Sequence, residues 1–146
     1  MQFYKKSLGQ NFLIDKNVIK KIISLVKVKN RNIIEIGPGD GALTYEILKL
    51  QPKTLTLIEK DNNLVENFKS RLKYEKKVKI LNRDILKFDI EKLCKSETIV
   101  FGNLPYNISS QILIKFLKFN VWPPKISDFI FMFQKELGEK IIGKFS

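Results

Sequence analysis

Short apolar runs alternate with helical patterns from Asn32 onward, and this alternation constrains the fold more than any other feature of the chain. The runs are rich in Ile, Leu, Val and Phe and cover residues 32–36, 54–58, 77–81, 98–101 and 128–133. Helical patterns occupy residues 42–50, 62–73, 108–119 and 135–143. Strands that are buried on both faces have continuous apolar sequences, so the pattern predicts an α/β fold, a mostly parallel sheet with helices on both faces. Because crossovers are right-handed, we expect a ligand at the edge where the carboxyl ends of the strands gather.

Composition narrows the chemistry that is available to the chain. Its 146 residues include no His and a single Cys, Cys94. This excludes Ser-His-Asp and Cys-His nucleophiles, zinc bound by His or Cys, and an intrachain disulfide, and we expect no metal site. The remaining groups are carboxylates, amides, aromatic rings or a bound cofactor. No apolar run approaches the roughly 18 residues that span a bilayer, so we expect a cytoplasmic protein without a membrane segment.

Positive charge is concentrated near the N-terminus. The whole chain has 27 Lys and Arg against 15 Asp and Glu, a formal net charge of +12. Residues 1–31 carry a large part of this excess on Lys5, Lys6, Lys16, Lys20, Lys21, Lys27, Lys29 and Arg31, opposed only by Asp15. Asp15 is placed to cap a helix that has Val18, Ile19, Ile22, Ile23 and Val26 at helical spacing. We therefore divide the chain into a basic arm with a first helix, residues 1–31, and a core, residues 32–146. The arm is the first candidate for polyanion contact, and the alternative is that its lysines form solvated helix faces.

A glycine-rich turn follows the first apolar run. The sequence from Glu35 to Thr44 contains Gly37, Gly39 and Gly41, and such glycines let the backbone approach a ligand closely. A nicotinamide site would use it as G-x-G-x-x-A with an acidic residue about 20 positions later. An S-adenosylmethionine site would use it as E-x-G-x-G-x-G, a form that Glu35 and Gly41 both suit. A tight turn without a ligand is the third interpretation, and the turn alone does not decide among them.

Acidic residues follow the second and third apolar runs. Glu59 comes directly after the second run, where a carboxylate can accept both hydroxyl groups of a ribose. Asp61 is better explained as the cap of the next helix. After the third run, Asp84 is placed to accept the exocyclic amine of adenine while Ile85 covers the ring, although an ordinary turn explains Asp84 equally well.

The segment Asn103-Leu104-Pro105-Tyr106 after the fourth run is the most specific signal. Pro105 fixes its own φ and keeps Leu104 extended, so the carbonyls of this turn stay outside helical hydrogen bonding. The Asn103 side-chain oxygen and the Leu104 carbonyl can then accept the two N–H bonds of an aromatic amine and orient its lone pair for attack. Tyr106 offers a ring on which a base can stack. An ordinary turn that opens the next helix is the alternative.

Taken together, these motifs resemble the ribosomal RNA adenine N6,N6-dimethyltransferases of the kasugamycin-sensitivity type, over essentially the whole chain. Lys6 to Asp15 resembles the family's N-terminal motif, and Gln134-Lys135-Glu136 its segment after the fifth strand. The resemblance implies a Rossmann-like class I methyltransferase fold and an S-adenosylmethionine cofactor. The implied cofactor contacts are Gln10, Asn11, Leu13, Gly37, Gly39, Glu59, Lys60, Asp84, Ile85 and Asn103. The implied catalytic residues are Asn103, Leu104, Pro105 and Tyr106, and the implied RNA contacts are Lys5, Lys6 and Tyr106.

The resemblance also implies a substrate, which is two adjacent adenosines near the 3′ end of small-subunit (16S) rRNA, and a role in small-subunit biogenesis. The expected partner is the precursor of the small ribosomal subunit, with a monomeric enzyme when complete. Two alternatives remain: a macrolide-resistance-type methyltransferase of 23S rRNA adenine, and a non-catalytic rRNA-binding factor on the same fold.

Family members continue beyond the point that corresponds to Ser146, through two further strands and a small helical domain. The sequence is therefore expected to be an N-terminal half, with the sheet truncated after about five strands. We expect a nearly complete cofactor pocket, a fifth strand that is prone to association at its edge, and weak or absent catalysis on ribosomal particles.

Overall fold

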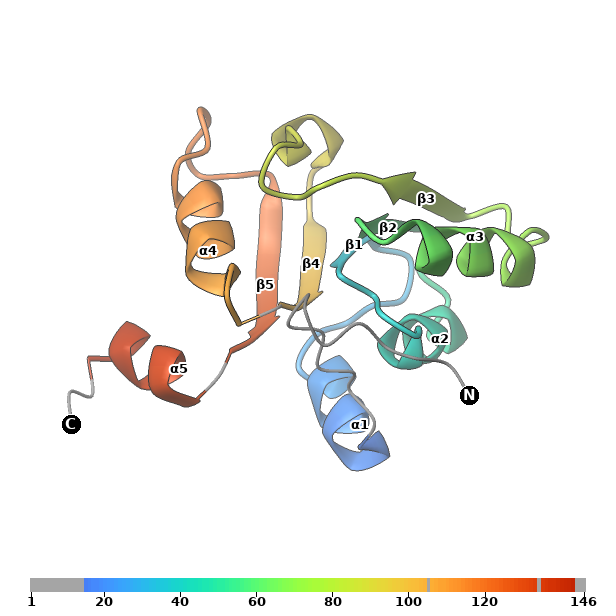
Figure 1. The fold of residues 1–146 in the computed structure, drawn as a ribbon, viewed down its shortest axis with the longest axis horizontal. Helices are drawn as coiled ribbons and strands as arrows, with labels where there is room; N and C mark the ends of the chain where they lie inside the picture. The colour runs from blue at the N-terminus through green and yellow to red at the C-terminus, as the bar shows by residue number, and fades with distance from the viewer. Residues whose placement is uncertain (1–14, 105, 134, 144–146) are drawn as a thin grey trace.

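The protein forms a five-stranded parallel sheet in the computed structural model, which describes residues 15–104, 106–133 and 135–143 (Figure 1). The strands are β1 (Asn32–Ile36), β2 (Thr54–Glu59), β3 (Val78–Asn82), β4 (Thr98–Asn103) and β5 (Ile126–Met132). Their order is β3-β2-β1-β4-β5, and all neighbouring pairs are parallel. The first strand therefore lies in the middle of the sheet, with β2 and β3 on one side of it and β4 and β5 on the other. The predicted parallel α/β sheet is confirmed, and the order places the carboxyl ends of β1, β2 and β4 side by side.

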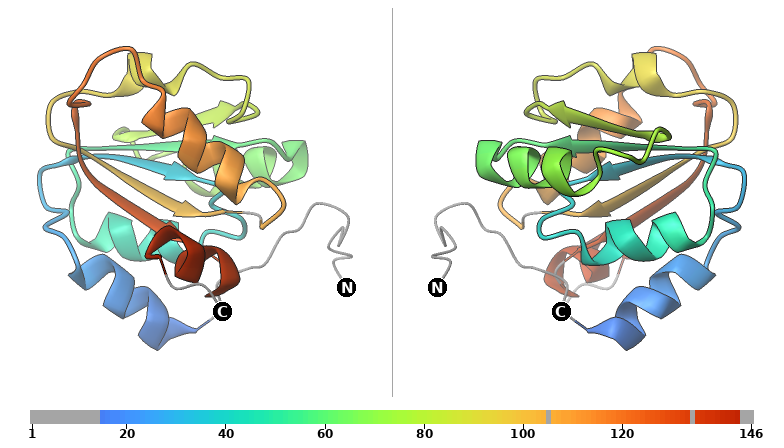
Figure 2. Two further views of the ribbon diagram at one scale, coloured as in Figure 1. Left: turned by 90° about the vertical axis from the view of Figure 1, so that its left-hand side faces the viewer. Right: turned by 90° about the vertical axis from the view of Figure 1, so that its right-hand side faces the viewer.

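Helices cover both faces of this sheet, as the sequence predicts. On one face, α1 (Lys16–Ser24), α2 (Ala42–Lys49) and α3 (Asn62–Arg71) pack on a core that includes Ile33, Leu55 and Leu57. On the other face, α4 (Ser109–Leu117) and the short 3-10 helix η2 (Ile90–Leu93) pack on Ile34, Ile58 and Val100. The two views of Figure 2 show α4 in front of one face and α2 and α3 in front of the other. A further helix, α5 (Lys135–Ile141), follows β5 and has no buried residue.

Two aspartates begin helices, as expected. The Asp15 carboxylate accepts hydrogen bonds from the backbone N–H groups of Asn17 and Val18, and Asp61 does the same for Asn63 and Leu64. Each carboxylate satisfies N–H groups that have no partner within their own helix. Capping by Asp61 also fixes the chain direction immediately after Glu59, which holds the end of β2 in place.

Most predicted element ends differ from those of the structure by one or two residues, and three differences stand out. The fifth strand begins at Ile126, two residues earlier than expected. The helix η2 was not predicted, because a single 3-10 turn has no recognisable periodicity. Val18 is 42% exposed although it lies at helical spacing with the buried Ile19 and Ile22, so the apolar stripe of α1 is narrower than expected.

Both outer strands of the described sheet have one unpaired edge. β3 and β5 each pair with a single neighbour, so the expected terminal position of the fifth strand is confirmed within the described residues. Association through that edge stays a prediction.

No helix in the described part of the chain is long and apolar enough to cross a membrane.

Candidate functional site

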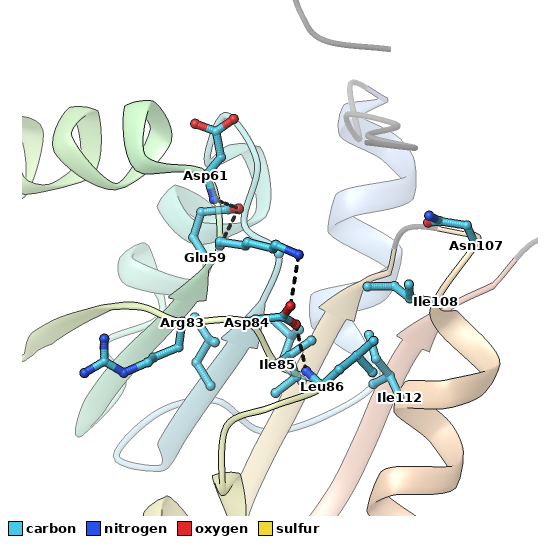
Figure 3. Close-up of a pocket in the computed structure, with 13 residues that line it drawn as sticks. Glu59, Asp61, Arg83, Asp84, Ile85, Leu86, Asn107, Ile108 and Ile112 are labelled. Carbon is cyan, nitrogen blue, oxygen red and sulfur yellow. Dashed lines mark hydrogen bonds and ion pairs between the residues drawn. The ribbon is translucent and has the colours of Figure 1, made fainter. Parts of the chain in front are cut away.

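A pocket of about 300 Å³ opens at the carboxyl ends of the strands, where the topology predicts a ligand site (Figure 3). Its polar wall includes Glu59, the last residue of β2, and Asp84, which lies in the segment after β3. Its apolar wall includes Ile85, with Ile108 and Ile112 contributed across the opening by the start of α4. The volume lies at the lower end of the range for small-molecule sites, and one apolar wall with a few converging polar groups is typical of them.

Glu59 is held in a fixed orientation by the backbone that follows it. Its Oε1 accepts hydrogen bonds from the backbone N–H groups of Lys60 (2.8 Å) and Asp61 (2.9 Å). The side chain is only 6% exposed, and this burial raises the pKa of the carboxyl above its usual value. The backbone N–H groups of Asp61, Lys60 and Gly39 oppose that rise in pKa by stabilising the charged form. Glu59 is therefore an oriented acceptor at the end of β2.

Asp84 is paired with Lys60 across the mouth of the pocket. The Lys60 Nζ donates to Asp84 Oδ2 at 2.9 Å, and the other carboxylate oxygen accepts from the backbone N–H of Leu86 at 3.0 Å. The hydrogen bond from Lys60 is the main cause that lowers the pKa of Asp84 below its usual value. Figure 3 places Asp84 between Glu59 and Leu86, with Arg83 pointing away from them. Asp84 is thus ionised and oriented, and Ile85 beside it is buried.

The glycine turn brings the end of β1 against the end of β4. Gly37 and Gly39 have φ values of 64° and 60°, a region that favours glycine. A Cβ at Gly37 would lie 3.4 Å from the backbone oxygen of Asn103. Gly37 lines the pocket, and the N–H of Gly39 is directed at Glu59. The turn therefore connects the acidic wall of the pocket with the Asn103 segment.

Glu35 lies beneath this turn and is fully enclosed. Its Oε2 accepts a hydrogen bond of 2.7 Å from the hydroxyl of Thr44, a residue of α2 that is itself buried. Burial raises the pKa of Glu35 to about 8, the bond from Thr44 opposes the rise, and the charge of Glu59 adds to it. This hydrogen bond links β1 to α2, the two elements that the glycine turn connects, so it stabilises the conformation of the turn.

The raised pKa of Glu35 predicts a pH-dependent stability. Between pH 4.5 and about 8 the folded state holds a proton that the unfolded state releases, so the free energy of unfolding falls as pH rises through that window. We expect the melting midpoint of Glu35→Gln, which does not titrate, to rise relative to that of the unchanged chain between pH 5 and 8, by roughly 5–10 °C. Thermal melts across this pH range measure the difference. The surface variant Glu75→Gln should show no such trend, and a constant offset for Glu35→Gln would contradict the prediction.

The Asn103 segment leaves β4 at the pocket and does not continue as a helix until Ser109. Asn103 is the last residue of β4 and is partly buried, and Leu104 is 7% exposed with its side chain in the core. Tyr106 is 55% exposed, so its ring is available to a partner. The described residues 104 and 106–108 are not helical, which agrees with the expectation for this turn. Pro105 lies outside the described residues.

The structure brings together some of the predicted site residues. Gly37, Glu59, Lys60, Asp84 and Ile85 line one pocket, with Gly39 beside Glu59. Asn103 lies next to that pocket through its contact with Gly37. Lys5, Lys6, Gln10, Asn11, Leu13 and Gln134 lie outside the described residues, as does Pro105. The roles assigned to all of these residues stay predictions.

Several lining residues were not predicted from the sequence. They are Ile36, Ile58, Asp61, Arg83, Leu86, Asn107, Ile108 and Ile112. The apolar members include the ends of β1 and β2, positions that parallel topology places at this edge. Arg83 and Leu86 were within reach of sequence analysis because they flank Asp84 and Ile85 directly. No cluster of acidic or Cys side chains that could hold a metal ion occurs within the described ranges.

The chain is similar to known sequences over its whole length. The family model described as "Ribosomal RNA adenine dimethylase" matches residues 1–146. Curated relatives include "Ribosomal RNA small subunit methyltransferase A" of Pelagibacter ubique, 46% identical over 97% of this chain, and the protein of the same name from Francisella tularensis, 44% identical over 95%. Both alignments cover 53% of the relative, so the chain spans about half the length of the curated relatives it matches.

Solved structures share the fold. A dimethyladenosine transferase from Plasmodium falciparum is 29% identical with a TM-score of 0.77, covering 91% of this chain and 46% of that one. The 23S rRNA methyltransferase ErmE is 25% identical with a TM-score of 0.76, covering 92% of this chain and 52% of that one. The class I methyltransferase fold that the sequence predicts is confirmed, and the chain belongs to the ribosomal RNA adenine dimethylase family.

Proposed function

We propose that this chain provides the cofactor site and the catalytic turn of an enzyme that transfers methyl groups from S-adenosylmethionine to N6 of adenosines in small-subunit rRNA. The observation that carries the proposal is the junction of the acidic pocket with the Asn103 segment. Gly37 lines the pocket, and a Cβ added to it would lie only 3.4 Å from the Asn103 carbonyl oxygen. The target would be the two adjacent adenosines near the 3′ end of the RNA, and the partner a precursor of the small subunit in the cytoplasm. The complete enzyme would act as a monomer.

The charge of the pocket favours S-adenosylmethionine over a nicotinamide dinucleotide. Glu59, Asp61 and Asp84 line it together with Lys60 and Arg83. The Lys60 charge is already paired with Asp84, and Arg83 points away from the acidic side chains (Figure 3). A cationic sulfonium ligand is attracted to such a surface, whereas the pyrophosphate of a dinucleotide is repelled. Glu59 would accept the ribose hydroxyls, Asp84 the adenine amine, and Ile85 would cover the adenine ring.

The Asn103 turn would prepare the target amine. The cofactor supplies an electrophilic methyl group on a sulfonium centre. The Asn103 side-chain oxygen and the Leu104 carbonyl would accept the two N–H bonds of the amine, which localises the nitrogen lone pair and directs it at the methyl carbon. The half-exposed Tyr106 would stack on the target base after it leaves its own stack. The methylated amine is cationic and loses its proton readily, so the absence of His is no obstacle.

Two other functions are weighed against this one. Methylation of large-subunit rRNA has support from the fold shared with ErmE, but the curated relatives at 41–46% identity carry the small-subunit name. A non-catalytic rRNA-binding factor would need the basic surface and no intact pocket. The ordered hydrogen bonds of Glu59 and Asp84 in the pocket favour an enzyme.

The direct test combines cofactor binding with product analysis. S-adenosylmethionine at about 100 times its Kd should raise the melting midpoint by roughly 5–10 °C, while NAD should leave it unchanged. Because the chain alone is expected to be a weak catalyst, unmethylated ribosomal RNA of both subunits is then incubated with the chain in excess, and any N6-methylated adenosine should appear in the small-subunit RNA alone. A shift with NAD, or product only in large-subunit RNA, would overturn the proposal. A shift with S-adenosylmethionine and no product would support the cofactor site and agree with the weak or absent catalysis expected of a chain that spans about half of its relatives.

A further inference from the structure

A second hollow, of about 280 Å³, lies at the amino ends of the strands, opposite the cofactor pocket. It is lined from β1 and β2 by Asn32, Thr54 and Thr56, and by lysines from the β3 region and from the segment before β4. Those lysines are Lys76, Lys77, Lys79 and Lys95. Ile34 of this hollow and Ile58 of the pocket belong to the same core cluster, and Asn32 alternates with Ile33 onto the side of Ile34, so this part of the hollow lies on the face of the sheet that carries the pocket. Ile33, which also lines the hollow, belongs to the cluster on the other face.

The hollow exists because this part of the sheet has little cover. The connections from β1 to β2 and from β2 to β3 contain α2 and α3, helices of 8 and 10 residues, on the other face. The connection from β3 to β4 contains only η2, a 3-10 helix of 4 residues, and its Leu93 reaches the rim of the hollow. The first residues of β2 and β3 are therefore left open on this face.

The lining is cationic and has no compensating acid. None of the described residues that line the hollow is acidic. Five ion pairs link described residues, and none of them includes Lys76, Lys77, Lys79 or Lys95. Lys79 pairs with Thr56 in the β2–β3 register, so one of the positive charges belongs to a strand of the sheet. Like charges held this close repel each other, and an anion between them removes that cost.

The floor of the hollow offers hydrogen-bond donors. The Thr54 hydroxyl donates to Asn32 Oδ1 at 2.8 Å, which turns the Nδ2 donors of Asn32 toward other partners. Thr56, which also carries a hydroxyl group, lines the same hollow. Amide and hydroxyl donors among lysines are the groups with which proteins bind phosphate oxygens.

We propose that this hollow binds backbone phosphates of the RNA substrate, as a docking site separate from the pocket where the chemistry occurs. The RNA identity rests on the proposed function. The strands between the two openings have 5 or 6 residues, which at about 3.3 Å per residue is a distance of roughly 16 Å. A single RNA helix is long enough to contact both openings at once. Phosphate contact at the hollow positions the RNA along the sheet without reading its sequence.

The test compares two triple variants with the same change in charge. In the docking variant, Lys77, Lys79 and Lys95 are replaced by Gln. In the control variant, Lys49, Lys69 and Lys73 are replaced by Gln, three lysines on or directly after α2 and α3 at the other face. The affinity for a fluorescein-labelled RNA stem-loop is measured by anisotropy at several KCl concentrations. Inorganic phosphate is added in a separate series as a competitor.

We expect the docking variant to bind the RNA at least about tenfold more weakly at 0.1 M salt, and its slope of log K against log salt to be smaller by about two to three. The control variant should stay within about threefold of the unchanged chain. Equal losses in the two variants, or no RNA binding by the unchanged chain, would overturn the proposal. At equal ionic strength, inorganic phosphate should weaken RNA binding by the unchanged chain more than by the docking variant, and equal weakening of the two would overturn the proposal.

The proposed function is tested separately on the same preparations. The docking variant should keep the melting shift that S-adenosylmethionine causes, because its substitutions lie at the other end of the strands. Loss of that shift in the docking variant alone would mean that the lysines act through the fold, and would also overturn the proposal. If the unchanged chain lacks the shift but the docking variant still loses RNA affinity, the methyltransferase proposal fails while the RNA contact stands.

Discussion

Replacement of Asn103 by Ala should lower the rate of methyl transfer by about 10²–10³-fold, because it removes one of the two acceptors that we propose orient the target amine. Asn103 is the last residue of β4, and its backbone oxygen packs against Gly37 of the glycine turn. The substitution changes only the side chain, so this backbone contact remains. RNA retention should change less than about threefold, since the basic surfaces are untouched. Single-turnover transfer of a tritiated methyl group measures the rate, and filter binding measures retention.

The matched control for this experiment is Asn63→Ala. Asn63 is exposed on α3, and only its backbone N–H takes part in the cap provided by Asp61. Its methylation rate should stay within about twofold of the unchanged chain. A normal rate for Asn103→Ala would remove Asn103 from the chemistry and favour an ordinary turn at this position. Equal loss of rate and of RNA retention would instead indicate a structural role for the side chain.

Much of this fold could be predicted from the sequence because its signals are local. The run at residues 32–36 forms β1 with the expected bounds, and Asp15 and Asp61 cap helices as their positions indicate. Parallel topology then places the residues that follow β1, β2 and β3 at one edge. This is why Gly37, Glu59 and Asp84, which are far apart in the sequence, were predicted to lie in one site.

Contacts between distant side chains could not be predicted in this way. The Lys60–Asp84 pair joins two loops, and the Glu35–Thr44 bond joins a strand to a helix. Both depend on side-chain rotamers that no periodicity encodes. The cationic hollow depends on the shortness of η2, which has no recognisable periodicity, so its lysines were not predicted as a site. Charge counting indicated the N-terminal arm instead, whose first 14 residues lie outside the described structure.

Replacement of Glu59 by Gln should weaken S-adenosylmethionine binding by about 10–100-fold, as expected when a charge-assisted hydrogen bond of roughly 1.5–3 kcal/mol is lost. The glutamine side-chain oxygen can still accept the two backbone N–H bonds that Glu59 Oε1 accepts from Lys60 and Asp61. Its amide nitrogen then replaces the second carboxylate oxygen, a donor in place of an acceptor. Calorimetric titration of both proteins with the cofactor measures the change in Kd.

A ligand without ribose hydroxyl groups identifies which contact has been lost. If Glu59 accepts these hydroxyls, the 2′,3′-dideoxy analogue of S-adenosylmethionine should bind weakly to the unchanged chain and lose little further affinity on Glu59→Gln. The surface variant Glu66→Gln on α3 should bind both ligands as the unchanged chain does. An equal loss of affinity for both ligands would instead mean that Glu59 acts through its charge on the sulfonium end. The two outcomes separate recognition of the ribose from attraction of a cation, although both place Glu59 at the cofactor.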